Sequence, residues 1–227
     1  MQKNFIMLFI VVFLMGIGWI FFRKNQILSR KCGSIIILNG PSAAGKTSLQ
    51  KKFQKMMMPN LWIKLGIDTL FDAPMPDIDL ENMAEWQKEN PIRWVTNTSD
   101  DAGNQVITLL TGDQGDRVAY GMNSAIAEYA KSGCNVIMDY IPYKKEWTSD
   151  LQQELAGLSV YWVKVSAPIE TLEAREIARG TSPKGHARSH YLNVENDGIS
   201  YQLEIDTSQT PVNEGAEKLK NLVLGLG

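Results

Sequence analysis

One eight-residue segment constrains the fold more than any other feature of this 227-residue chain. It follows the apolar run Ser34–Asn39 and matches the pattern GxxxxGK[ST] at every position, as Gly40, Pro41, Ser42, Ala43, Ala44, Gly45, Lys46 and Thr47. Such a loop lies between a buried strand and a helix, because the N–H groups at the helix start then converge on one anion. The apolar run predicts that strand and residues 47–57 predict the helix. We therefore expect a phosphate-binding loop (P-loop), in which Lys46 contacts the β- and γ-phosphates of a nucleotide and Thr47 ligates Mg²⁺.

The rest of the body alternates short apolar runs with amphipathic segments, a pattern typical of βα units around a mainly parallel sheet. It predicts four further strands and three further helices, with strands at residues 61–67, 135–138, 158–165 and 201–205 and helices before Gly133, at 168–179 and after Thr210. The predicted fold class is α/β. Residues 71–115 lack clear periodicity and are too many for a plain loop, so we expect an insertion with short helices that covers the substrate.

Two acidic residues follow predicted strands. Asp139 closes the strand at 135–138, where a carboxylate can hold Mg²⁺ through water. Asp68 closes the strand at 61–67, and in a parallel sheet both strand ends open onto the crevice that holds the P-loop. We expect Asp68 to be a general base that takes the proton of a substrate hydroxyl. The structural alternatives are a turn residue for Asp139 and a helix N-cap for Asp68.

Positive charge gathers near the end of the predicted helix at 168–179. Arg175 and Arg179 are four residues apart, so they project from one helical face. The Gly- and Pro-containing segment 180–190 follows them, and we expect it to be a lid that closes over the phosphates. A solvated basic turn is the alternative. His186 and His190 have no acidic partner at a useful spacing, so the sequence assigns them no role.

The N-terminus predicts a membrane anchor. Residues 5–22 carry no charge and would form a helix of about 27 Å, close to the thickness of a bilayer core. More basic residues follow this run than precede it, which places the domain at 32–227 in the cytoplasm, after a transmembrane helix within residues 1–31. A cleavable signal peptide is the alternative, but the charges directly after the run argue against it. From residue 68 onward the chain has 13 basic and 25 acidic residues, which argues against a nucleic-acid partner, and no segment indicates a protein partner.

Five segments together resemble a known family, the chloramphenicol phosphotransferase-like P-loop small-molecule kinases, from about residue 34 to the C-terminus; they are IIILNGPSAAGKTSLQ, LGIDTLFDAPMP, NVIMDY, LEAREIARG and YQLEIDTSQTP. The resemblance implies a P-loop kinase fold close to shikimate and adenylate kinases, with a five-stranded parallel sheet. It also implies ATP and Mg²⁺ as cofactors and a small-molecule hydroxyl as the acceptor. The base then corresponds to Asp68 and the P-loop lysine to Lys46. In related nucleoside monophosphate kinases the first member of such an arginine pair stacks on adenine and the second contacts phosphates, which implies these roles for Arg175 and Arg179.

Two other functions remain open. A nucleotide-sugar kinase of the toxin type would share the same phosphoryl-transfer chemistry and differ in its acceptor. A membrane-tethered nucleotide-binding regulator would bind the nucleotide without transferring its phosphoryl group. Asp68 distinguishes the regulator, because a switch protein needs no base beside the γ-phosphate.

Overall fold

The structure is a computed structural model that describes residues 31–141, 143–180, 183–195 and 198–226. The segment predicted to be a membrane anchor, residues 1–31, lies outside these ranges apart from its last residue. Within the described ranges, no helix has both the length and the apolar character needed to cross a bilayer.

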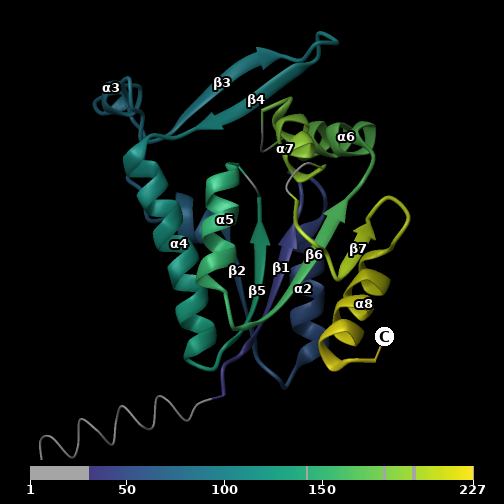
Figure 1. Cartoon of the computed structure of the whole chain (residues 1–227). Helices are drawn as coiled ribbons and strands as arrows, with labels where there is room; N and C mark the ends of the chain where they lie inside the picture. The colour runs from purple at the N-terminus through teal and green to yellow at the C-terminus, as the bar shows by residue number, and fades with distance from the viewer. Residues whose placement is uncertain (1–30, 142, 181–182, 196–197, 227) are drawn as a thin grey trace, which may run out of the picture.

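Five parallel strands form the central sheet (Figure 1), in the order β2 (Trp62–Gly66), β5 (Asn135–Tyr140), β1 (Ser34–Asn39), β6 (Ser159–Ser166) and β7 (Leu203–Asp206). The prediction of a five-stranded parallel α/β sheet is therefore confirmed. β1 is the middle strand, hydrogen-bonded to β5 on one edge and to β6 on the other. A strand with neighbours on both edges and helices on both faces has no solvent side, which explains its unbroken run of apolar residues.

Helices cover both faces of the sheet. α4 (Asp113–Lys131) and α5 (Lys145–Glu154) pack on one face, and Ile35 and Ile37 of β1 point into the core that they form. α2 (Lys46–Met57) and α8 (Val212–Leu224) pack on the other face, against Ile36 and Leu38. The alternation of β1 side chains thus joins two apolar cores through one strand.

The insertion at 71–115 differs from its prediction. It begins within a π-helical turn, η1 (Asp68–Asp72), and contains one short α-helix, α3 (Met83–Trp86). Its second half is an antiparallel hairpin, β3 (Trp94–Ser99) and β4 (Gln105–Leu110), so the expectation of short helices was wrong there. In β4 only Ile107 and Leu109 are buried, the two-residue period of a strand with one covered face. The hairpin extends beyond the carboxyl ends of the central strands (Figure 1).

The second half of the segment predicted to be a lid, residues 180–190, is helical. After α6 (Ile169–Arg179), the chain becomes helical again at α7 (His186–Glu195). The C=O of Gly185, just before α7, accepts a hydrogen bond of 3.0 Å from the N–H of Ile107 in β4. A Cβ at Gly185 would lie 2.5 Å from the carbonyl oxygen of Gln105, and φ is +95° there, so only glycine fits this contact. The start of α7 is thus held against the hairpin.

Candidate active site

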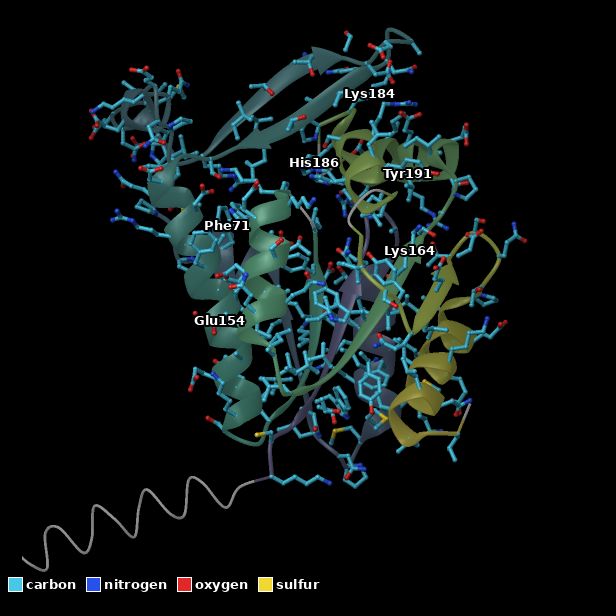
Figure 2. The ribbon with its side chains drawn as sticks, in the orientation of Figure 1. Phe71, Glu154, Lys164, Lys184, His186 and Tyr191 are labelled. Carbon is cyan, nitrogen blue, oxygen red and sulfur yellow. The ribbon has the colours of Figure 1, made fainter. Side chains whose placement is uncertain are left out.

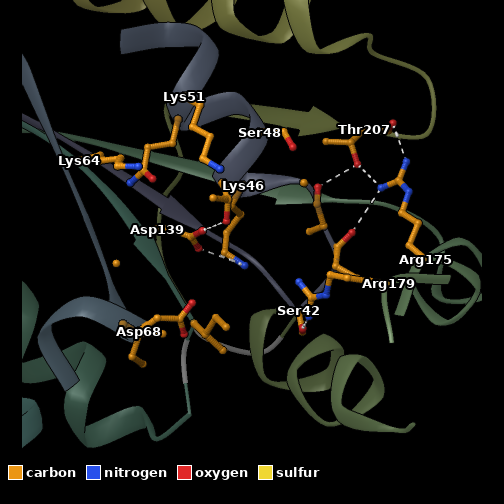
Figure 3. Close-up of a pocket in the computed structure, with 18 of the residues that line it drawn as sticks. Ser42, Lys46, Ser48, Lys51, Lys64, Asp68, Asp139, Arg175, Arg179 and Thr207 are labelled. Atoms are coloured by element: carbon orange, nitrogen blue, oxygen red, sulfur yellow. Dashed lines mark hydrogen bonds and ion pairs between the residues drawn. The ribbon is translucent and has the colours of Figure 1, made fainter. Parts of the chain in front are cut away.

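A cleft of about 970 Å³ opens at the carboxyl ends of the central strands. It brings together most of the residues that the sequence singled out, from four separate stretches of the chain: residues 42–47, Asp68, Asp139, and Arg175 with Arg179. Figure 3 shows Lys46 and Asp139 between Asp68 and the lysines of α2 and β2, with the two arginines on the far side.

Glycines give the P-loop its shape. Gly45 is the N-cap of α2 with φ +88°, a conformation that side-chain-bearing residues rarely adopt. Gly40 passes so close to β6 that a Cβ would lie 2.1 Å from the carbonyl oxygen of Val165. No acidic side chain occupies the first turn of α2, so the N–H groups there face the cleft without a competing carboxylate.

Lys46 is the most buried cation of the site, at 4% exposure. Its Nζ donates hydrogen bonds to the carbonyl oxygens of Gly40, at 2.8 Å, and Pro41, at 2.7 Å. It also lies 3.5 Å from Oδ1 of Asp139. Burial lowers the pKa of Lys46, and the carboxylate of Asp139 opposes that shift. The loop and Asp139 together hold the ammonium group at the centre of the cleft.

Thr47 and Asp139 present oxygen ligands at one point. The Thr47 hydroxyl donates a 2.6 Å hydrogen bond to Oδ2 of Asp139, across 92 residues of sequence. A hydroxyl and a carboxylate beside a phosphate-binding loop are the donor set that Mg²⁺ prefers, since it retains several waters and takes few protein ligands. The residues present therefore fit the ion. Across the described part of the chain, no group of three or more His, Cys, Asp or Glu side chains could hold a metal by itself.

Asp68 differs from its prediction in secondary structure but not in location. It is the first residue of η1, two positions beyond the last residue of β2, rather than the end of the strand. Its side chain is exposed in the cleft and makes no hydrogen bond or ion pair with the described residues, so it caps no helix. A carboxylate with no structural partner is free to contact a ligand.

The arginine pair contacts the P-loop. Arg175 donates to Oγ1 of Thr207 at 2.8 Å and to its carbonyl oxygen at 3.0 Å, and so joins α6 to the segment between β7 and α8. Arg179 donates to the hydroxyl of Ser42 at 3.3 Å. The i, i+4 spacing thus directs both side chains toward the same loop, Arg179 near its start and Arg175 beside Thr207.

Glu176, between these arginines, fixes the start of α7 and was missed by the sequence reasoning. The side chain is 1% exposed and accepts hydrogen bonds from two backbone N–H groups, Gly185 at 2.8 Å and Ala187 at 2.7 Å. Arg188 of α7 then bonds Glu173 of α6 at 2.7 Å and Asp100 of the hairpin at 3.2 Å. The arginine helix, α7 and the hairpin are therefore tied into one unit.

Sequence reasoning missed two further side chains of the cleft: it assigned His186 no role and did not single out Tyr143. Tyr143 follows β5, His186 begins α7, and both line the cleft. Their ring centroids are 6.2 Å apart, and His190 packs against both. No sequence signal could have joined them, because Tyr143 and His186 are 43 positions apart and belong to no motif.

Comparison with known proteins agrees with this arrangement. Residues 33–223 match the family described as chloramphenicol phosphotransferase-like protein. Two proteins of Mycobacterium tuberculosis, from strains CDC 1551 and H37Rv, are each 32% identical over 192 residues, which is 82% of this chain and 80% of theirs. Both carry the name "Putative O-phosphotransferase".

Solved structures show the same fold at low sequence identity. A sugar kinase from Janibacter sp. HTCC2649 has a TM-score of 0.57 at 16% identity, over 84% of this chain and 94% of its own. The APS kinase of Mycobacterium tuberculosis, solved with AMPPNP and APS, has a TM-score of 0.52 at 16% identity, over 85% and 98%. With its P-loop, its five-stranded sheet and these relatives, the chain belongs to the chloramphenicol phosphotransferase-like family and is a P-loop kinase.

Proposed function

We propose that this enzyme transfers the γ-phosphoryl group of ATP to a hydroxyl group of a small molecule. One observation carries the proposal: the carboxylate of Asp68 lies in the same cleft as Lys46 and makes no hydrogen bond or ion pair with the described residues. A carboxylate beside the phosphate site, with no structural partner, suits a base for an attacking hydroxyl.

The chain supplies binding and orientation. Backbone N–H groups of the P-loop and Lys46 hold the β- and γ-phosphates, and Arg179 adds positive charge from the other side of the loop. Thr47 and Asp139 would hold Mg²⁺, which neutralises phosphate charge when bound. Arg175 and Thr207 lie on the far side of the loop, where they suit the nucleoside.

The transfer step needs one proton acceptor. Asp68 orients the acceptor hydroxyl and takes its proton as the oxygen attacks the γ-phosphorus, while the bond to the β-phosphate oxygen breaks and ADP leaves with the electron pair. The regulator alternative leaves the placement of Asp68 unexplained. A nucleotide-sugar kinase would use the same residues and differ only in the acceptor.

Asp68→Asn tests the proposal. The amide keeps the size of the side chain and cannot accept the proton, so ATP affinity should persist while product formation falls by roughly 10²–10⁴-fold. Asp101→Asn, in the exposed turn of the hairpin, is the matched control and should leave both unchanged. Melting temperature, ATP affinity and product formation are measured on the same preparations. Normal product formation by Asp68→Asn would exclude Asp68 as the base and remove the observation that carries the proposal.

We also propose that residues 1–31 anchor this kinase domain to a membrane, with the domain in the cytoplasm. The support is the uncharged run at 5–22 and the basic residues that follow it. A cytoplasmic location would also give the cleft access to ATP.

A further inference from the structure

Three aromatic side chains with polar atoms gather at one end of the cleft without hydrogen-bond partners. The ring of His190 lies 4.6 Å from that of Tyr143 and 4.4 Å from that of His186. Nδ1 of His186 and both ring nitrogens of His190 are buried without a hydrogen bond. The phenol of Tyr143 likewise makes none with the described part of the chain. Buried polar groups are nearly always paired, and Tyr143 and His186 line the cleft, so their unpaired side chains point to a ligand that binds there.

The cluster lies at the same cleft as the proposed base. Tyr143 and His186 line the same cleft as Asp68 and Lys46. His190 is 1% exposed and stands behind them as support. Figure 2 shows His186 beneath the β3–β4 hairpin, on the side of α7 toward α5. Arg175 and Thr207, the proposed nucleoside side, also line the cleft and bond to each other.

The charges near the cluster include one ion pair and leave its titratable groups neutral. Arg93 forms a 2.5 Å ion pair with Asp72. Burial, together with the positive charges of Arg93, Arg179 and Lys46, lowers the pKa of His186 to about 4. Burial and the carboxylate of Asp72 raise the pKa of Tyr143. At neutral pH both groups are therefore uncharged.

An uncharged phenol and an uncharged imidazole can each donate and accept a hydrogen bond. A hydroxyl group can do the same, whereas a carboxylate or phosphate only accepts and an ammonium only donates. We propose that Tyr143 and His186 bind the acceptor substrate, and that this acceptor is an uncharged polyhydroxy compound, such as a sugar or a cyclitol. They would bind hydroxyls next to the one that Asp68 deprotonates. The inference rests on the proposed phosphoryl transfer and adds the substrate class to it.

An anionic acceptor would need different residues. Lys51 and Lys64 line the cleft without an ion pair among the described residues, but in Figure 3 they lie on the other side of Lys46 and Asp139 from Asp68. An acceptor held by these lysines would turn away from the Tyr143 cluster. Use of an anionic acceptor is therefore the principal outcome that would contradict the inference.

The first experiment finds the charge class of the acceptor. A cell metabolite extract is separated on anion- and cation-exchange resins into neutral, anionic and cationic fractions, and each is incubated with the full chain, Mg²⁺ and γ-³²P-labelled ATP. We expect a labelled product from the neutral fraction. After phosphatase treatment, the recovered acceptor should consume periodate, which cleaves the carbon–carbon bond between adjacent hydroxyl groups.

A product from the anionic or cationic fraction alone, or a neutral acceptor with a single hydroxyl, would overturn the inference but not the proposed function. No product from any fraction, with ATP binding intact, would contradict the proposed function and this inference together.

The second experiment tests the two residues with the acceptor so identified. Tyr143→Phe keeps the ring that packs on His190 and removes only the hydroxyl, and Tyr129→Phe makes the same change at an exposed position of α4. Loss of one hydrogen bond should lower kcat/KM for the acceptor by about tenfold, with KM for ATP and the melting temperature unchanged. His186→Gln should act in the same direction.

An acceptor analogue that lacks the adjacent hydroxyl tests the contact directly. With this analogue, Tyr143→Phe should no longer lower kcat/KM, since the hydroxyl that Tyr143 would bind is already absent. An undiminished penalty with that analogue, or none with the natural acceptor, would show that Tyr143 does not bind it.

Discussion

Glu176→Gln should loosen the connection between the arginine helix and the hairpin. Glutamine keeps the size of the side chain but has no charge and presents one oxygen in place of two. At present the two carboxylate oxygens accept hydrogen bonds of 2.8 Å from Gly185 N–H and 2.7 Å from Ala187 N–H. One of these N–H groups would keep an acceptor, and the other would face the amide NH₂ in a site that is 1% exposed.

The cost follows from those two bonds. A hydrogen bond to a charged group contributes about 1.5–3 kcal/mol, and a buried N–H left without a partner costs about 1–3 kcal/mol. The two contributions overlap, so we expect the free energy of unfolding to fall by about 2–4 kcal/mol. For a domain of this size, each kcal/mol lowers the melting temperature by about 2–4 °C. The expected shift is therefore about 4–16 °C.

Thermal and urea unfolding measure this change, and hydrogen exchange locates it. The Gly185 and Ala187 amides should exchange at least tenfold faster in Glu176→Gln, because opening of this contact becomes easier. Glu170→Gln, an exposed change on the same helix, should alter stability by no more than about 0.5 kcal/mol. A melting temperature within 1 °C of that of the parent protein would correspond to a change in the free energy of unfolding of only about a few tenths of a kcal/mol. Such a result, with unchanged exchange at both amides, would refute the role given to Glu176.

Three further predictions concern the arginines, pH and the N-terminus. Arg179→Ala should mainly lower kcat and Arg175→Ala should mainly raise KM for ATP, so steady-state kinetics showing equal, small effects would contradict their assignment. The free energy of unfolding, measured from pH 7.5 to 4.5, should fall as the pH falls. The pKa of His186 is lowered to about 4 in the folded state, so the unfolded chain takes up the proton first. Stability that is present above pH 6.5 is therefore lost as the pH falls toward 4. The part of the loss that is due to His186 should be at most about 3 kcal/mol, less where water enters the cleft, so the total loss should be smaller in His186→Gln. A chain beginning at Gly33 should bind ATP unchanged, and an alkaline phosphatase fusion at the C-terminus of the full chain should be inactive; activity would place the domain outside the cytoplasm.

Sequence reasoning predicts the parts of this fold that local patterns determine. The run before Gly40 is apolar at consecutive positions because β1 is covered on both faces, and that pattern identifies a central strand without any tertiary information. The P-loop motif likewise encodes its own geometry, since the positive φ of Gly45 and the close approach of Gly40 require glycine. Asp139 could be placed beside Thr47 because carboxyl ends of parallel strands share one edge of the sheet.

Features that depend on tertiary contacts escape such reasoning. The hairpin has one covered face, so β4 carries only two buried apolar positions and its signal is weak beside that of β1. α7 shows little amphipathic pattern because its contacts include the polar Glu176 and the hairpin backbone as well as an apolar core. Its start depends on a hydrogen bond from Ile107, which local sequence cannot reveal.

The histidines show why a residue with no sequence role can still belong to the site. The two histidines lack an acidic partner, and in a solvated loop that would leave them idle. The fold instead packs both rings against Tyr143, and burial together with the positive charges of Arg93, Arg179 and Lys46 lowers the pKa of His186 and keeps its imidazole neutral. A neutral imidazole can both accept and donate a hydrogen bond, which suits recognition of hydroxyl groups. The P-loop half of the cleft can therefore be identified from a motif. The proposed acceptor half is assembled from residues distant in sequence, so no local pattern identifies it.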